Sequence, residues 1–185
     1  MSDSVIQNVQ ERMDKVLSNL RREFASVRAG RATPAMLDKV TVEYYGSPMP
    51  INQVAGISSP EPRLLVISPW EKSMLSEIEK AIQRSDLGLN PANDGNVIRL
   101  SIPALTEERR QELVKQVRKL AEEARISIRN VRRDGNDELK KSEKNGDLTE
   151  DEVRRFMDKI QQVTDKFIAQ VDSLLEDKEK DVTQV

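Results

Sequence analysis

Apolar residues recur every three or four positions in three stretches of the chain, which is the spacing that places them on one face of an α-helix. These stretches predict one helix over about residues 3–28, a second over 107–145, and a third that begins after Thr149. The expected apolar stripes are Ile6, Val9, Met13, Val16, Leu20, Phe24 and Val27; then Leu113, Val117, Leu120, Ala124, Ile128 and Val131; then Val153, Phe156, Ile160, Val163, Phe167, Val171 and Leu174.

The middle helix determines the predicted architecture because of its length. It contains no proline, Thr106 is a suitable N-cap, and Gly146 is a suitable stop. At 1.5 Å per residue it would extend about 58 Å, so it needs partners along most of its surface. The other two helices can supply them, and the pattern therefore predicts an elongated three-helix bundle packed like a coiled coil.

Residues 31–104 lack the helical period and hold all eight prolines of the chain. The element with the strongest local signal is a helix, because Ser68-Pro69-Trp70-Glu71 combines an N-cap, a proline at the first position and an acidic residue at the third. The expected elements are strands over 40–45, 51–54, 55–57, 64–67 and 96–102, with this helix running from Ser68 to about Leu87. This block therefore predicts a small β/α/β domain.

The order of these segments predicts an α+β protein with an L-shaped outline. The β/α/β domain, residues 31–104, is inserted into a three-helix bundle domain made of residues 1–30 and 105–185. An insertion has two connections to its host, and two short connections permit bending about one axis while limiting free rotation. The expected hinge residues are Gly30, Arg31, Pro103, Ala104 and Leu105.

The composition excludes most classes of enzyme. The 185 residues contain neither Cys nor His, so thiolate nucleophiles, Cys-based metal sites and the side chain that titrates near neutral pH are all missing. We therefore expect no catalytic residue, no metal and no cofactor, and an enzyme built on carboxylates or lysine alone is the weakest alternative. The sequence shows no signal peptide and no apolar run of about 18 residues, which predicts a soluble cytoplasmic protein.

Charge is nearly balanced, with 30 Lys and Arg against 32 Asp and Glu, yet arginines gather on one flank of the middle helix. At about 100° per residue, four arginines share an azimuth beside the apolar stripe: Arg118, Arg125, Arg129 and Arg132. Residues 124–133 contain four arginines and no acid. Because the guanidinium fork binds phosphate with two hydrogen bonds, this flank predicts contact with an RNA backbone; a solvated helix face is the open alternative.

Three further features are interpreted as structural. Asp134-Gly135-Asn136-Asp137 resembles the start of a calcium loop but lacks the glutamate that such a loop requires. Gly135 is expected to cost the helix about 1 kcal/mol and to mark a soft point. Trp70 and the pair Tyr44-Tyr45 are expected to pack inside the inserted domain, with a partner surface as the alternative.

Several motifs occur in order along the chain. They are Arg28-Ala29-Gly30-Arg31-Ala32, Val42-Glu43-Tyr44-Tyr45-Gly46, Ser85-Asp86-Leu87-Gly88-Leu89-Asn90-Pro91, Pro103-Ala104-Leu105-Thr106-Glu107-Glu108-Arg109-Arg110 and Val131-Arg132-Arg133-Asp134. This set resembles the signature of bacterial ribosome recycling factors. The resemblance implies a three-helix bundle joined by a hinge to a β/α/β domain. It also implies a factor that binds the ribosome after termination, with the bundle across the A and P sites of the large subunit. With elongation factor G and GTP, such a factor splits the subunits and frees mRNA and tRNA.

The resemblance also implies a set of rRNA-binding residues and partners. Matching motif positions give Arg28, Arg31, Arg129, Arg132 and Arg133, and the charge pattern adds Arg109, Arg110 and Arg125. The expected partners are large-subunit rRNA of the ribosome and elongation factor G, with no membrane and no DNA, and the chain is expected to be a monomer. A coiled-coil adaptor that binds other helices is the main alternative. It predicts exposed apolar residues on the bundle and binding that does not respond to salt, whereas phosphate contacts weaken as salt is added.

Overall fold

The computed structural model describes residues 2–27 and 30–183 and divides into two compact units. The first unit contains three long helices, α1 (Ser2–Ser26), α3 (Glu107–Lys144) and α4 (Glu150–Thr183). The second contains all the strands and a shorter helix, α2 (Leu75–Arg84). The α+β fold class predicted from the sequence is therefore confirmed.

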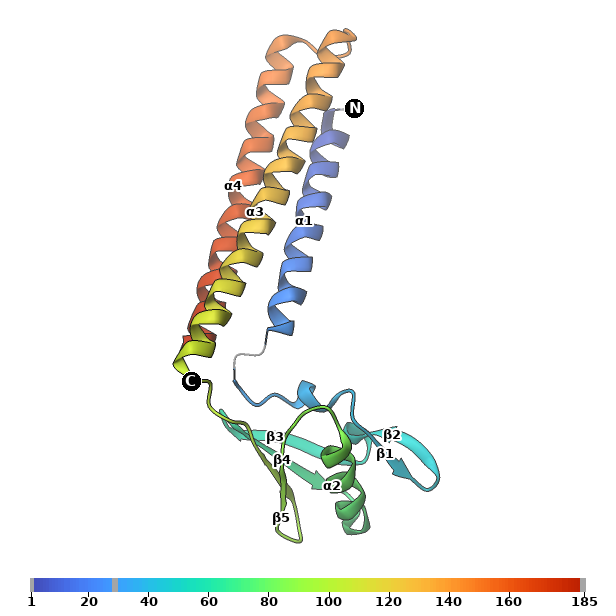
Figure 1. Ribbon diagram of the computed structural model, residues 1–185. Helices are drawn as coiled ribbons and strands as arrows, with labels where there is room; N and C mark the ends of the chain where they lie inside the picture. Colours follow the sequence, from blue (N-terminus) through green and yellow to red (C-terminus); the bar gives the residue numbers. More distant parts are fainter. Residues whose placement is uncertain (1, 28–29, 184–185) are drawn as a thin grey trace. The chain divides into compact units, whose positions relative to one another are not determined.

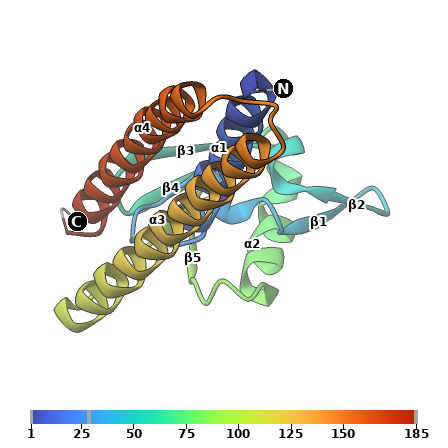
Figure 2. The same cartoon turned by 90° about the horizontal axis from the view of Figure 1, so that it is seen from above.

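The three long helices run side by side as a bundle, with α3 and α4 joined by a tight turn (Figures 1 and 2). Each helix contacts both of the others. Their shared core consists of Val5, Val9, Met13, Leu17, Leu20, Phe24, Leu113, Val117, Ala121, Ala124, Ile128, Val131, Leu139, Val153, Ile160, Phe167 and Val171. The observed helix bounds agree with the sequence prediction to within two residues, apart from the unpredicted end of α4.

The expected apolar stripes were partly misplaced. Leu17 and Ala121 are buried, whereas the neighbouring Val16 and Leu120 are only half-buried. A helix that packs against two partners buries a face wider than a single seam, so residues on both sides of the expected stripe enter the core. In α4, Thr164 also lies in this core, where its hydroxyl donates to the carbonyl of Ile160 at 2.7 Å.

Gly135 lies at a close contact between all three helices, and the predicted soft point is wrong. A Cβ at this position would lie 2.7 Å from Val9 Cγ2 of α1 and 3.1 Å from Ile160 Cδ1 of α4. The glycine is buried within an uninterrupted α3. Its missing side chain is therefore used for packing, which the helix propensity scale does not describe.

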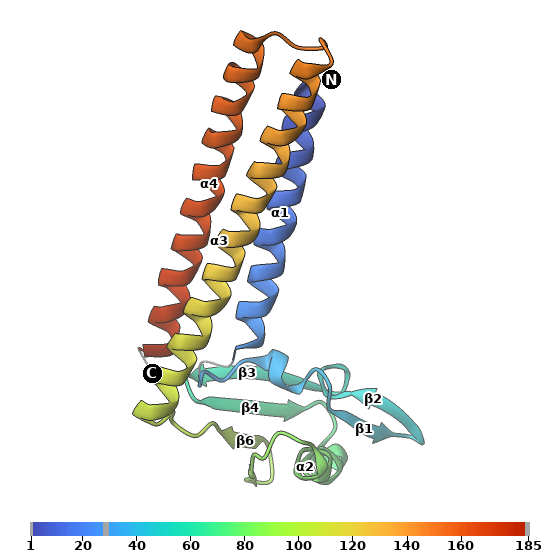
Figure 3. The same ribbon diagram turned by 45° about the horizontal axis from the view of Figure 1, so that its top comes forward.

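The second unit is built on an antiparallel sheet of four strands in the order β3 (Ala55–Glu61), β4 (Leu64–Pro69), β6 (Ile98–Ser101) and β5 (Pro91–Asn93). A separate hairpin joins β1 (Thr41–Tyr44) to β2 (Ser47–Pro50), and it lies near α2 in Figure 3. Short 3₁₀ helices occupy Pro34–Leu37, Ile51–Gln53 and Lys72–Met74. The core of this unit includes Leu37, Val42, Ile51, Leu65, Ile67, Ile78, Ile82, Ile98 and Leu100.

Two local predictions in this unit are wrong. Ser68 and Pro69 end strand β4, where they pair with Gly56 and Ala55, and α2 begins only at Leu75. The pairing of this strand with its neighbour outweighs the local helix-start signal. The expected strand over 51–54 is instead a 3₁₀ turn, from Ile51 to Gln53.

Candidate nucleic-acid interface

Six of the eight predicted rRNA-binding arginines lie on α3. They are Arg109, Arg110, Arg125, Arg129, Arg132 and Arg133. Arg31 is exposed in the second unit, and Arg28 lies outside the described residues. The structure therefore tests the geometry of the arginine flank on α3.

A ladder of ion pairs between α3 and α4 occupies part of this flank. Arg118 Nε donates to Glu179 Oε1 at 2.5 Å. One heptad further along α3, Arg125 Nη2 donates to Asp172 Oδ1 at 2.6 Å, and its Nε donates to the same oxygen at 2.9 Å. The flank is therefore not a uniform row of exposed cations, because two of its four arginines pair with carboxylates of α4.

The acidic side of this ladder has its sequence signal in α4 and not in α3. Acids recur every seven residues along α4: Asp151, Asp158, Asp165, Asp172 and Glu179. In an antiparallel pair of helices, a heptad of cations on one helix faces a heptad of anions on the other. The partners of these arginines lie on a different helix from the arginines themselves, so the pattern within α3 does not reveal them.

The ladder raises the pKa of both arginines. For Arg118, the hydrogen bond to Glu179 is the main cause of the higher pKa. For Arg125, partial burial acts to lower the pKa, but the hydrogen bonds to Asp172 and Glu122 outweigh it. Both guanidinium groups are thus held in the charged form by carboxylates of the same chain.

The next arginines toward the α3–α4 turn are not neutralised in this way. The closest carboxylate to Arg129 is that of Glu122, at 3.7 Å, and the Arg129 side chain is 44% exposed. Arg132 Nη1 donates to the neutral amide oxygen of Gln161 at 3.2 Å. Arg133 is exposed and has no ion pair within residues 2–27 and 30–183. These three arginines form what we call the distal arginine cluster.

The first turn of α3 carries a second group of cations. Arg109 Nη1 donates to Glu112 at 2.8 Å and remains 58% exposed. Arg110 lines a groove of about 450 Å³ together with Lys115 and Arg118. This groove belongs entirely to the first unit and is separated from the distal arginine cluster by several helical turns.

The aromatic residues of the second unit correct another prediction in part, because Tyr44 is half-buried and packs against the core as expected. Tyr45 is 82% exposed and Trp70 is 70% exposed, so neither packs in the core. Tyr45 has a φ of 48° in the hairpin turn, where Gly46 follows with a φ of 82°. The hydroxyls of Tyr44 and Tyr45 donate to the two carboxylate oxygens of Glu71, at 2.9 and 3.2 Å. The hydrogen bond to Glu71 raises the pKa of the Tyr44 hydroxyl.

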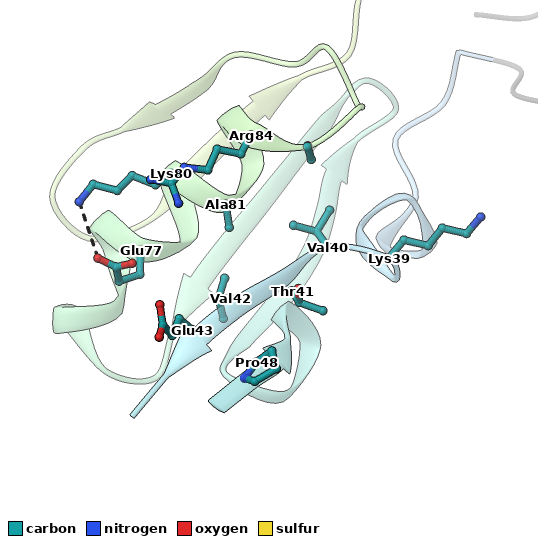
Figure 4. A pocket seen from close by; sticks show the side chains of 11 residues that line it. Lys39, Val40, Thr41, Val42, Glu43, Pro48, Glu77, Lys80, Ala81 and Arg84 are labelled. Carbon is teal, nitrogen blue, oxygen red and sulfur yellow. Dashed lines mark ion pairs between the residues drawn. The ribbon is translucent and has the colours of Figure 1, made fainter. Parts of the chain in front are cut away.

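A groove of about 480 Å³ lies between strand β1 and helix α2 (Figure 4). It has charges of both signs, with Glu43 and Glu77 near one end and Arg84 near the other, and Lys80 pairs with Glu77 at 3.7 Å. The second strand of this hairpin carries Pro48, which also lines the groove, and Pro50; neither has the N–H needed to pair with a further strand. This groove contains none of the arginines predicted to bind rRNA.

Within the part of the chain that the structure describes, no three acidic side chains come together as a metal-binding group. None of the helices in the same residues is long and apolar enough to cross a membrane.

The chain is an α+β protein that combines a long, arginine-bearing three-helix bundle with a small sheet domain. Solved structures with this combination are known. The structure of the chain is similar to a solution structure of the ribosome recycling factor, with a TM-score of 0.75, 40% identity and coverage of 100% of this chain and 98% of the other. The family model for ribosome recycling factor matches residues 20–182. The chain belongs to the ribosome recycling factor family, whose members are translation factors and not enzymes.

Relatives with this description match over the full length of both chains. The ribosome-recycling factor of Bacillus subtilis (strain 168) is 56% identical over 185 residues, and that of Clostridioides difficile (strain 630) is 57% identical, with 100% of each chain covered. A further structural match, with a TM-score of 0.63 and 47% identity over 98% of both chains, comes from models for the T. thermophilus ribosome recycling factor and the E. coli elongation factor G bound to the E. coli post-termination complex. The resemblance inferred from the sequence motifs is confirmed.

Proposed function

We propose that this chain binds the post-termination ribosome in the cytoplasm and, with elongation factor G and GTP, separates the subunits and releases mRNA and tRNA. Full-length similarity to ribosome-recycling factors supports this role. So does the similarity to a ribosome recycling factor placed with elongation factor G on a post-termination complex. The chain acts as a monomer and needs no cofactor of its own, because the GTPase supplies the work.

The distal arginine cluster is the observation that carries the RNA-binding part of this proposal. Arg129, Arg132 and Arg133 lie within five residues of one helix, and no carboxylate lies within 3.5 Å of their guanidinium groups among the described residues. A cluster of this kind can bind the phosphate backbone and fix the position of the bundle without reading a base sequence. Arg28, Arg31, Arg109 and Arg110 remain predicted contacts. Arg125 is the weakest candidate, because phosphate would have to displace two carboxylates.

The bundle suits a mechanical role. Its continuous packed core resists bending, since bending would open gaps between closely packed side chains. The two connections near Gly30 and Leu105 are proposed to let the second unit move while the bundle stays bound. Elongation factor G can then act on a factor that transmits force to the ribosome.

The coiled-coil adaptor is disfavoured by the surface of the bundle. Among the described residues, Ile126 is the one large apolar side chain of the bundle that is strongly exposed, at 49%. An adaptor that binds other helices needs a contiguous apolar stripe on its outer face. The adaptor and the ribosome factor also differ in their response to salt.

Cosedimentation with 70S ribosomes across a salt series tests the proposal. We expect wild-type binding to weaken steeply with salt, because phosphate contacts release counterions. Replacing Arg132 with Ala should weaken binding about tenfold and reduce the slope of log affinity against log salt by about one. The matched control is Arg154→Ala, which removes an exposed arginine of α4 outside the predicted site.

Two results would contradict this assignment. Binding that is insensitive to salt would favour the adaptor. A collapse of the melting temperature in Arg132→Ala would show that this arginine supports the fold and not the interface.

A further inference from the structure

Arg132 differs from the other arginines that face α4 because its hydrogen-bond partner carries no charge. Arg118 and Arg125 each donate to a carboxylate of α4. Arg132 Nη1 instead donates to Gln161 Oε1 at 3.2 Å. Part of the Arg132 side chain is buried, and its Nε has no hydrogen-bond partner among the described residues.

The heptad register shows which carboxylate Arg132 would otherwise meet. From the Arg118–Glu179 pair to the Arg125–Asp172 pair, α3 advances by seven residues and α4 retreats by seven. The same step leads from Arg125 to Arg132 and from Asp172 to Asp165. Asp165 is thus the expected third acid of the ladder.

Gln161 stands between Arg132 and that acid. Its Nε2 donates to Asp165 Oδ1 at 2.8 Å, and its Oε1 accepts from Arg132. The amide therefore has one orientation, because its donor end is held by Asp165 and only its acceptor end is left for the guanidinium. The carboxylate of Asp165 is used to orient an amide instead of neutralising an arginine.

We infer that Gln161 and Asp165 are positioning residues for Arg132 and hold its guanidinium in place while leaving its charge available to an RNA phosphate. The inference rests on the proposed function, in which Arg132 contacts rRNA. A neutral acceptor restrains the long arginine side chain, so less conformational freedom is lost when phosphate binds. Because the acceptor is not an anion, phosphate does not compete with a carboxylate for the same cation.

The heptad ladder thereby separates two tasks among similar arginines. Arg118 and Arg125 join α3 to α4 through direct ion pairs. Arg132 takes the next position in the same register, but it donates to the side-chain amide of Gln161, which in turn donates to Asp165. A single change from amide to carboxylate should convert this third position into another internal ion pair.

The test is therefore Gln161→Glu, assayed by cosedimentation with 70S ribosomes across the salt series. We expect affinity to fall about tenfold and the salt slope to fall by about one, as for Arg132→Ala, because the introduced carboxylate pairs with the arginine. The melting temperature should change little, because the exposed ion pair gained with Arg132 is offset by the lost bond to Asp165 and by repulsion between the two carboxylates.

Two controls separate direct pairing from a general change in charge. Gln162→Glu adds the same charge at the adjacent exposed position, without a bond to Arg132, and should change affinity by no more than about twofold. The double variant Gln161→Glu with Asp165→Asn keeps the net charge of the wild type. It should nevertheless bind as weakly as Gln161→Glu, because Arg132 still meets a carboxylate.

The outcomes distinguish this inference from the proposed function. If Arg132→Ala weakens binding while Gln161→Glu behaves like Gln162→Glu, the positioning role is wrong and the rRNA contact stands. If the charge-neutral double variant recovers wild-type affinity, the effect is one of net charge and the positioning role is again wrong. If Arg132→Ala itself binds normally, both proposals fail.

Discussion

Gly135 shows how a residue that is unfavourable for its own helix can be required by its neighbours. Glycine in a helix interior costs about 1 kcal/mol relative to alanine. Here the absent side chain leaves the space in which Val9 of α1 and Ile160 of α4 approach α3. The packing of three helices therefore determines the residue, and the local propensity does not.

Gly135→Ala should lower the stability of the bundle. Val9 Cγ2 would lie 2.7 Å from the new Cβ, and a buried valine has few rotamers with which to move away. We expect overpacking of about 1–3 kcal/mol to outweigh the gain in helix propensity, and thermal unfolding followed by circular dichroism measures the difference. Val9→Ala in the same chain should recover part of the loss. A higher melting temperature for Gly135→Ala alone would contradict the packing argument.

The arginines show how far the sequence alone defines the candidate site. The azimuth of Arg132 on α3 follows from its position in the sequence, because a helix fixes the direction of each side chain. Whether an arginine of α3 pairs with a carboxylate depends on the facing residue of α4. Arg125 and Arg132 look equivalent in the sequence of α3. They differ because α4 presents Asp172 to the first and Gln161 to the second. The acids spaced seven residues apart on α4 indicate which arginines can form ion pairs. Assigning each acid to an arginine also requires the register between α3 and α4.

At the scale of elements, the long helices were predicted well and the short strands poorly. A repeat sustained over 38 residues in α3 specifies a helix even when one position is misassigned. Strand β2, with two prolines in four residues, and β5, which begins with Pro91, carry no such signal. They are strands because they pair with β1 and β6 in short hairpins, so the strand signal lies in the partner strand and not in the residues of β2 and β5 themselves.

The start of α4 is an element boundary that the local sequence predicts correctly. Thr149 precedes the helix, its N–H donates to Glu152 Oε2 at 2.8 Å, and the Glu152 N–H donates back to Thr149 Oγ1 at 3.3 Å. This is the capping box predicted from the sequence. The hydrogen bond from the Thr149 backbone, followed by that from its hydroxyl, lowers the pKa of Glu152.

Glu152→Gln should remove a pH-dependent part of the stability. Because the folded-state pKa lies below the ordinary value of 4.5, the contribution is fully present above that pH and is lost as pH falls through the folded value. We expect the variant to be less stable than the wild type at pH 7, and the difference to shrink at about pH 3, when unfolding is measured in urea. Glu150→Gln, in the same helical turn, is the matched control. An equal difference at both pH values would exclude the role of the Glu152 charge.

At the scale of the whole molecule, the chain passes between the two units twice, and each connection is held to the second unit by a backbone hydrogen bond. Ala32 N donates to Pro62 O at 2.7 Å, and Ile102 N donates to Arg63 O at 2.8 Å. Both connections are thus anchored at neighbouring residues of the β3–β4 turn. The proposed hinge residues Gly30 and Pro103 lie outside these two anchors, on the side of the bundle.

Gly30→Pro should therefore impair subunit splitting more than ribosome binding. Gly30 has a φ of 75°, whereas proline fixes φ near −65°, so the connection must take a different path while the arginines of α3 are unaffected. Light scattering with elongation factor G and GTP measures splitting, and cosedimentation measures binding. Gly88→Pro makes the same change at a glycine with a φ of 64° outside the connections, and it should leave splitting nearly unchanged. Equal losses of splitting and binding in Gly30→Pro would show that this segment supports binding itself, and the hinge would have to lie elsewhere.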